Sequence, residues 1–177
     1  KNISMKKFIF QSYCKVNLSL RILRKISHSH HKIQSLTTFC NIYDTITISE
    51  IKGCKDQVIF FGNFNKNINL QKNTITKTLQ LLRKEKKLDK YFKLLIEKNI
   101  PHGSGLGGGS SNAASLINYL NFQYKLGLTK KRKHYLANKI GSDVSLCLVK
   151  KNSLITGKKD QIVRYEKSFK LNLLVVF

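Results

Sequence analysis

The chain of 177 residues is long enough for one ordinary domain, and its 41% hydrophobic residues, which include ten Phe and seven Tyr, argue against global disorder. Its 33 Lys and Arg against nine Asp and Glu give a formal net charge of +24, which would normally suggest a nucleic acid or an anionic membrane as partner. The lysines are spread along the chain, and the densest basic clusters, at residues 84–87 and 130–133, have no interleaved aromatic platform. We therefore expect no nucleic-acid partner and keep a basic nucleic-acid-binding module as the alternative.

The spacing of the cysteines and the hydropathy of the sequence indicate the cellular compartment in which the protein is expected. The four cysteines show no CxxC pair and no metal-binding interval, and no apolar run approaches the roughly 18 residues of a spanning helix. The N-terminus also lacks the apolar stretch of a signal peptide. We therefore expect reduced thiols in a cytoplasmic protein with no membrane partner, while the oligomeric state is not predicted.

The first part of the chain is predicted to form strands. An apolar run over residues 6–11 predicts one strand, and alternation over 15–22 predicts a second. On this pattern Lys15 and Asn17 project together from the face opposite the core. The polar stretch 25–32 is interpreted as a loop. Further strands are expected at 33–39, 45–51, 58–61 and 91–97.

Helices are predicted in the second part, so the fold class is α+β. Asn73 is expected to be the N-cap of a first helix, and Thr129 the N-cap of one that ends near Ile140. Between them, a helix capped by Ser110 or Ser111 is expected to run to about Tyr124. The apolar run 144–148 is interpreted as strand-like, and 170–177 as an unfinished strand.

The stretch from Pro101 to Ser115 is the most distinctive in the chain. It holds five of the ten glycines and the only proline. Glycines let a backbone approach a ligand closely and adopt positive φ angles. The stretch also leads into a predicted helix, whose first N–H groups and dipole attract phosphate. It therefore predicts a cradle for the phosphates of a nucleotide.

Other glycine loops fit this stretch less well. A Walker A loop needs a lysine directly before its Ser or Thr, and here Gly109 stands before Ser110. Gly103, Gly105 and Gly108 spell GxGxxG, but the acid expected about twenty residues later is absent. A protein-kinase loop would be followed by a Val-Ala-Ile-Lys strand, which is also absent. A structural glycine turn before a core helix remains the alternative.

Two further places carry residues that could act in chemistry. Asp143 is the only acid between Lys98 and Lys159, so it is a candidate catalytic carboxylate, although acids are also common in turns. Three histidines within residues 28–31 invite a metal interpretation. No carboxylate or cysteine accompanies them, so an exposed or substrate-facing segment is favoured and no metal ligand is predicted.

With these stretches in view, the sequence resembles the GHMP kinases over residues 8–177. The family motif Pro-x-x-x-Gly-Leu-Gly-Gly-Gly-Ser-Ser-(Asn/Asp)-Ala-Ala is matched in full by residues 101–114. Residues 14–18 match Ala-Lys-(Val/Leu)-Asn-Leu except at the first position, and residues 141–145 match Gly-Ala-Asp-Val-Pro around an intact aspartate. Weaker family matches lie at residues 31–36, 43–45 and 73–75.

The resemblance implies a fold and an activity. It implies a two-layer domain over residues 6–168, similar to the second domain of ribosomal protein S5, with residues 169–177 as the start of a truncated C-terminal domain. The implied activity is that of a small-molecule kinase that uses ATP and Mg²⁺. The branch of the family that it resembles phosphorylates the 2-hydroxyl of cytidine diphosphate-linked methylerythritol for isoprenoid precursors. Another GHMP small-molecule kinase is the alternative.

The resemblance also implies roles for individual residues. Asp143 would accept the proton of the substrate hydroxyl, while Lys15 would keep Asp143 ionised and stabilise the transition state. The two side chains must then meet within about 3 to 4 Å. Asn17, His30 and His31 would bind substrate, with His30 in the place of the usual stacking Tyr. The implied ATP-binding residues are Asn73, Pro101, His102, Gly103, Ser104, Gly105, Leu106, Gly107, Gly108, Gly109, Ser110 and Ser111.

Overall fold

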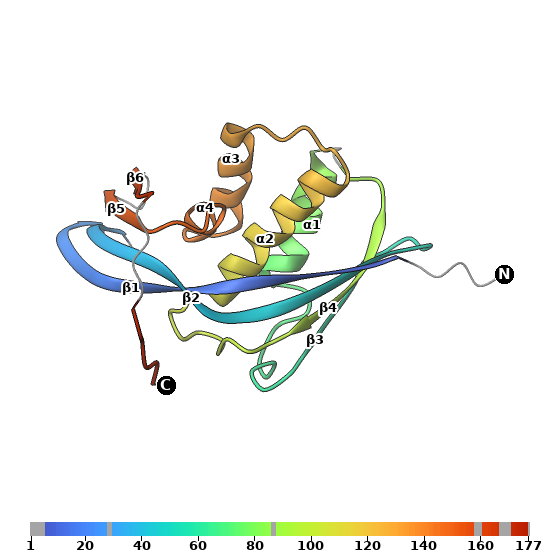
Figure 1. Ribbon diagram of the computed structural model, residues 1–177. Helices are drawn as coiled ribbons and strands as arrows, with labels where there is room; N and C mark the ends of the chain where they lie inside the picture. Colours follow the sequence, from blue (N-terminus) through green and yellow to red (C-terminus); the bar gives the residue numbers. More distant parts are fainter. Residues whose placement is uncertain (1–5, 28–29, 86–87, 158–160, 167–170, 177) are drawn as a thin grey trace.

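The computed structural model describes residues 6–27, 30–85, 88–157, 161–166 and 171–176, with only the backbone of 26, 27, 30 and 31 (Figure 1). In this part of the chain six strands form one sheet in the order β3-β4-β2-β5-β6, and β1 pairs with β2. The helices lie together on one side of the sheet (Figure 1). The predicted two-layer α+β architecture is therefore confirmed.

The sheet is built on a long antiparallel hairpin of β1 (Lys7–Ser27) and β2 (His30–Ile51). The four strands predicted for this region are thus two continuous ones, and the loop predicted over 25–32 is wrong at its described residues, 25–27 and 30–32. Strand pairing continues through Arg24 with Lys32 and Lys25 with His31. Cross-strand hydrogen bonding does not depend on apolar side chains, so polar composition alone did not reveal the strand.

The core lies between the helices and the middle of the sheet. β4 (Tyr91–Glu97) pairs with residues 45–51 of β2 and runs parallel to β3 (Gln57–Phe61). Alternate residues of β4 are buried, as its pattern predicts. They pack against α1 (Thr74–Lys84) and α2 (Gly108–Gln123), and each fully buried large apolar side chain contributes about 1.5 to 3 kcal/mol. The largest fully buried side chains of this core are Phe92, Ile46, Ile48, Ile75, Leu79, Leu82, Leu94, Ile96, Leu116, Ile117 and Leu120.

The predicted orientation of the second strand is wrong in detail. Leu20 and Ile22, expected to face the core, are 56% and 67% exposed, whereas Lys15 is only 5% exposed. The strand register shifts between Tyr13 and Lys15 and again beyond Asn17. Such irregularities interrupt alternation and turn side chains to new directions. As a result, the consecutive residues Cys14 and Lys15 are both buried.

The last third of the described chain departs most from the sequence-based expectations. Thr129 does cap α3 (Lys130–Ile140), accepting a hydrogen bond from the Arg132 N–H. The strand expected at 144–148 is instead a single helical turn, α4 (Val144–Cys147). All of the side chains in this turn are buried, whereas a half-buried strand would bury only alternate ones. β5 (Ser153–Gly157) and β6 (Gln161–Arg164) extend the sheet and were not predicted.

Residues 171–176 do not form the expected strand. The domain boundary expected after residue 168 falls on 167–170, which lie outside the described residues, and it stays a prediction. No helix in the described ranges is both long and apolar enough to cross a membrane.

Candidate active site

The glycine stretch begins after β4 and leads directly into α2. The helix N-cap is Gly107, with φ 68° and ψ 20°, and no side chain caps the helix. The predicted cap by Ser110 or Ser111 is therefore wrong, because both residues lie inside the first helical turn. A left-handed N-cap is open to glycine at little steric cost, so the backbone itself makes the turn. Gly103 and Gly105 also have positive φ, 77° and 78°.

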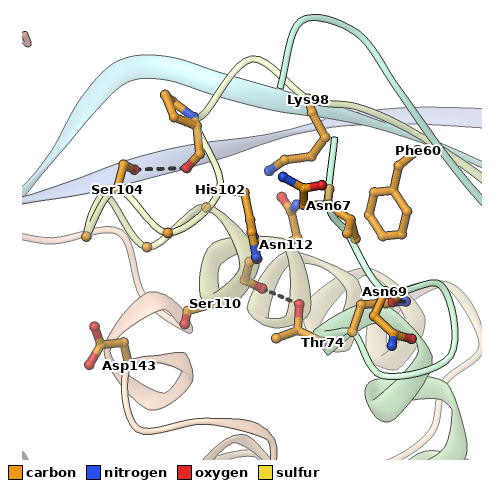
Figure 2. A pocket seen from close by; sticks show the side chains of 18 of the residues that line it. Phe60, Asn67, Asn69, Thr74, Lys98, His102, Ser104, Ser110, Asn112 and Asp143 are labelled. Atoms are coloured by element: carbon orange, nitrogen blue, oxygen red, sulfur yellow. Dashed lines mark hydrogen bonds between the residues drawn. The ribbon is translucent and has the colours of Figure 1, made fainter. Parts of the chain in front are cut away.

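A hollow of about 420 Å³ lies over this loop, within the size range of small-ligand sites. The residues that line it come from β3, from the segment before α1 and the start of α1, from the residue after β4, from the glycine loop and the first turns of α2, and from the turn before α4 (Figure 2). They are Phe60, Asn67, Ile68, Asn69, Lys72, Asn73, Thr74, Lys98, Pro101, His102, Gly103, Ser104, Gly105, Gly107, Gly108, Gly109, Ser110, Asn112 and Asp143.

Ten of the twelve residues expected to bind ATP are in that set, and Leu106 and Ser111 are not. The Leu106 carbonyl instead accepts a hydrogen bond from the Lys15 N–H, with N to O at 2.9 Å. The Ser111 hydroxyl donates to the sulfur of buried Cys147 at 3.4 Å. These two residues attach the loop to β1 and to α4, so their contacts are structural.

Asn73 acts first as a helix cap. Its side-chain oxygen accepts from the Thr76 N–H at 2.9 Å, as the sequence predicts for an N-cap. The next residue, Thr74, donates its hydroxyl to the Gly109 carbonyl at 2.7 Å (Figure 2). The N-termini of α1 and α2 are thereby tied together at one wall of the hollow. A phosphate placed there would meet the positive ends of two helix dipoles.

Lys15 and Asp143 meet as the sequence predicts. The Lys15 Nζ lies 3.3 Å from Asp143 Oδ2, and the two side chains are only 7% and 19% exposed. Asp143 lies in the turn before α4 and makes no side-chain cap hydrogen bond to that helix. Lys15 Nζ also donates to Asn17 Oδ1 at 3.2 Å. The shift of register in β1 is what turns Lys15 toward this side of the sheet.

A second, smaller hollow of about 180 Å³ lies on the far side of this ion pair. Asp143 lines both hollows, so the ion pair lies where they adjoin. Leu20 and Ile22, which β1 leaves exposed, form part of the second hollow. Its lining residues are Lys15, Asn17, Leu20, Ile22, Ile33, Ser35, Asp143 and Ile155.

The histidine segment is only partly placed. The backbone of His30 and His31 begins β2 and pairs with Ser27 and Lys25. Their side chains lie outside the described residues, so their predicted contacts with substrate stay predictions.

One cluster of polar residues at the site was missed by sequence reasoning. Asp44, Lys98 and Asn112 are 0%, 3% and 2% exposed, and Asp44 forms an ion pair with Lys98. Lys98 and Asn112 both line the larger hollow (Figure 2). A charged residue within an otherwise apolar strand pattern was the available signal at Asp44, but periodicity does not say which distant residue pairs with it.

Cys147 lies directly behind the loop, in a buried environment that disfavours the reactive thiolate. Burial raises the pKa of this thiol to about 11, and the nearby Asp143 carboxylate adds to the rise. A nucleophilic cysteine needs a lowered pKa, because the thiolate is the reactive form. The arrangement instead offers a phosphate-compatible cradle, a carboxylate and an ammonium group, which suits transfer of a phosphoryl group to a hydroxyl.

Comparison with known proteins supports the fold. The family described as GHMP kinases N terminal domain matches residues 73–151, so this part of the chain is a GHMP kinase N-terminal domain. A relative from Pelagibacter ubique named 4-diphosphocytidyl-2-C-methyl-D-erythritol kinase is 37% identical over 97% of this chain and 60% of its own length. A relative of the same name from Ehrlichia chaffeensis is 36% identical over 90% of this chain and 54% of its own.

Solved structures show the same fold. A crystal structure of 4-(cytidine 5'-diphospho)-2C-methyl-D-erythritol kinase gives a TM-score of 0.73 at 23% identity, covering 89% of this chain and 55% of that one. Mevalonate kinase of L. major in complex with R-mevalonate gives a TM-score of 0.66 at 17% identity, covering 95% and 55%. The chain thus spans between half and two thirds of the length of these proteins.

Proposed function

We propose that this chain is the nucleotide-binding part of a kinase that transfers phosphate from ATP to the 2-hydroxyl of 4-diphosphocytidyl-2-C-methyl-D-erythritol. The observation that carries the proposal is the Lys15–Asp143 ion pair, which lies between the glycine-loop hollow and the smaller hollow. The names of the relatives support the substrate. In this role the protein acts on small molecules in the cytoplasm, in the synthesis of isoprenoid precursors.

The glycine loop would hold the triphosphate. Its positive-φ turns at Gly103, Gly105 and Gly107 keep side chains away from the bend, so a ligand can approach the backbone. The first N–H groups of α2 have no partners within the helix and can donate to phosphate oxygens. Holding the donor rigidly supplies much of the catalysis in phosphoryl transfer, which depends on positioning and charge stabilisation.

Mg²⁺ would arrive with ATP. Among the described residues that line the larger hollow, Asp143 is the one carboxylate, and Ser110 adds a hydroxyl. This donor set fits Mg²⁺, which typically takes one or two carboxylates and fills its other positions with phosphate and water. When bound, the ion neutralises charge on the phosphates.

The proposed reaction takes place at Asp143, where the two hollows adjoin. The acceptor hydroxyl lies at Asp143 and gives its proton to the carboxylate as its oxygen forms a bond to the γ-phosphorus. The bond from that phosphorus to the bridging oxygen breaks, and ADP leaves with the electron pair. The Lys15 ammonium, 3.3 Å from Asp143, stabilises the negative charge that develops around the acceptor oxygen.

Asn17, His30 and His31 would bind the rest of the substrate. Asn17 lines the smaller hollow, and its Oδ1 already accepts from Lys15, so it is held in place. The backbone at His31 would read the cytosine edge, and His30 would stack on the base, in the place where the family resemblance implies Tyr.

The direct test is substrate choice. Release of ADP would be followed with 4-diphosphocytidyl-2-C-methyl-D-erythritol, mevalonate and homoserine, each at the same ATP concentration. We expect the highest kcat/KM for the cytidine compound. A preference for mevalonate or homoserine would favour another GHMP kinase and contradict the proposed substrate.

A nucleic-acid-binding role is the alternative that the +24 charge favours. Salt separates the two roles. Binding to a phosphate backbone through six to ten contacts falls by about 10³- to 10⁵-fold between 50 and 200 mM salt. We expect phosphoryl transfer to change far less over that range.

A further inference from the structure

The buried carboxylate of Asp44 sits beneath the glycine loop and accepts hydrogen bonds from several directions. Its Oδ1 accepts from the backbone N–H groups of Asn99 and Ile100, at 2.8 and 2.9 Å. Its Oδ2 accepts from the Asn112 side-chain amide at 2.9 Å and pairs with the Lys98 ammonium. Asp44 is 0% exposed, so all of these contacts are made away from solvent.

These donors flank the glycine loop. Asn99 and Ile100 are the two residues directly before Pro101, where the loop starts. Asn112 belongs to the first turns of α2, where the loop ends. One carboxylate on β2 therefore holds both ends of the loop against the sheet.

Lys98 links Asp44 to the hollow, because it pairs with Asp44 and also lines the hollow. A Cβ atom at Gly108 would lie 3.3 Å from Lys98 Nζ and 2.9 Å from Ile100 Cγ2. The loop backbone thus rests directly on two residues whose positions Asp44 fixes. The ammonium group faces the hollow beside Asn112 (Figure 2).

Asp44 also fixes how the Asn112 amide is turned. The amide nitrogen points at the carboxylate, and the amide oxygen has no hydrogen-bond partner among the described residues. Reversing the amide would place its oxygen against a carboxylate oxygen. Both atoms are hydrogen-bond acceptors with negative charge, so they would repel each other. The orientation of Asn112 in the wall of the hollow is therefore set by Asp44.

We infer that Asp44 is a positioning residue of the glycine loop: it does not line the hollow, and it sets the loop geometry through Lys98, Asn112 and the backbone before Pro101. The inference rests on the proposed function in taking ATP as the ligand. Small displacements of groups that position a ligand can cost about 100-fold in rate, so an anchor of this kind controls function from outside the site.

Asp56 provides a matched control. It also accepts from a basic side chain and from a backbone N–H: Arg83 at 2.7 and 2.8 Å, and the Phe92 N–H at 2.8 Å. Its contacts join α1 to the start of β4 and do not involve the glycine loop. Asp44→Asn and Asp56→Asn each remove one paired carboxylate, and the Asp44 pair is the more deeply buried, with side chains 0% and 4% exposed against 16% and 22% for Asp56 and Arg83. Thermal unfolding of both variants therefore has to be compared with their affinities, so that loss of stability is separated from loss of binding.

The experiment titrates a non-hydrolysable ATP analogue into the wild-type chain and both variants, with thermal unfolding measured alongside. We expect Asp44→Asn to weaken binding by about 10- to 100-fold and Asp56→Asn to leave it within about twofold. Equal affinity in a folded Asp44→Asn variant, or equal weakening in both variants, would overturn the inference.

Asp44→Asn leaves a buried ammonium without its partner, which is strongly destabilising. If that variant does not fold, Asp44→Asn/Lys98→Met removes both charges, and Asn112→Ala removes one arm of the network. Each is expected to weaken analogue binding by about tenfold or more. Wild-type affinity in either folded variant would overturn the inference.

Amide hydrogen exchange without nucleotide separates this inference from the proposed function. Exchange at residues 103–109 is expected to rise in Asp44→Asn and to stay at the wild-type rate in Asp56→Asn. Wild-type exchange in Asp44→Asn would overturn the anchoring. If the wild-type chain fails to bind the analogue but exchange rises as expected, the anchoring is supported and the proposed ligand is wrong.

Discussion

Gly107 and the stem of Lys15 are in direct contact. A Cβ atom at Gly107 would lie 2.7 Å from Lys15 Cγ and 3.3 Å from its Cε. Gly107 also has a φ of 68°, as the N-cap of α2. Glycine is thus required here both for the turn of the backbone and for the passage of the lysine that reaches Asp143.

We expect Gly107→Val to abolish nucleotide binding while the chain remains folded. A branched side chain would displace Lys15, strain the turn and obstruct the phosphate cradle. Titration with a non-hydrolysable ATP analogue measures the effect. Unchanged affinity in a folded variant would remove the loop from the site.

Gly127 supplies the control for that substitution. It has a φ of 66°, and a Cβ atom there would meet nothing within 4 Å. Gly127→Ala and Gly107→Ala should each cost about 1 to 2 kcal/mol for the left-handed backbone. Only Gly107→Ala is expected to weaken binding of the analogue as well, because only it crowds Lys15.

The sequence predicted best what depends on neighbouring residues. Asn73 and Thr129 were correctly identified as caps because a cap contacts residues only a few positions away. β4 was placed correctly because its alternation matches its burial. The glycine motif likewise located the larger hollow, since one continuous segment forms much of its wall.

What was missed depends on contacts across the chain. The register shift near Lys15 arises from pairing with β2, and nothing in the alternation of β1 reveals it. Residues 144–148, most of which form α4, looked like a strand because a short, fully buried apolar run does not show by its periodicity whether it is a strand or a helical turn. Asp44 lies on β2, and the partners of its carboxylate come from the residues directly after β4 and from α2, so only the folded chain identifies them.

The buried cysteines should be protected from alkylation. Burial raises the pKa of Cys14 and of Cys147 to about 11, while Cys54 is exposed. Because the thiolate is the reactive form, we expect a thiol reagent at pH 8 to modify Cys54 first and the two buried thiols only after unfolding. Mass spectrometry of timed samples measures this. Early labelling of Cys147 would contradict the burial of α4 against α2.

The same thiols predict a loss of stability in alkali. Their folded pKa values lie above the ordinary value of 9.0, so the folded chain holds protons that the unfolded chain has released. The contribution is fully present below pH 9 and is lost as pH rises from 9 to about 11. Urea unfolding at pH 8 and pH 10 should show a decrease of about 1 to 3 kcal/mol. Cys147→Ala should make the decrease smaller.

The Lys15–Asp143 pair gives the sharpest test of the proposed chemistry. Asp143→Asn keeps the size of the side chain and removes the base, so it should lower turnover by about 100-fold or more while ATP-analogue affinity stays nearly intact. Lys15→Ala should also act mainly on turnover, because the ammonium lies 3.3 Å from the Asp143 carboxylate.

The double variant shows whether the two residues act together. Both contact the same hydroxyl in the proposed reaction, so Lys15→Ala/Asp143→Asn should lose much less than the product of the two single losses. Steady-state turnover of all four proteins at saturating ATP measures the coupling. Multiplicative losses would mean that the residues work separately, and near-normal turnover in Asp143→Asn would return Asp143 to the role of an ordinary turn residue.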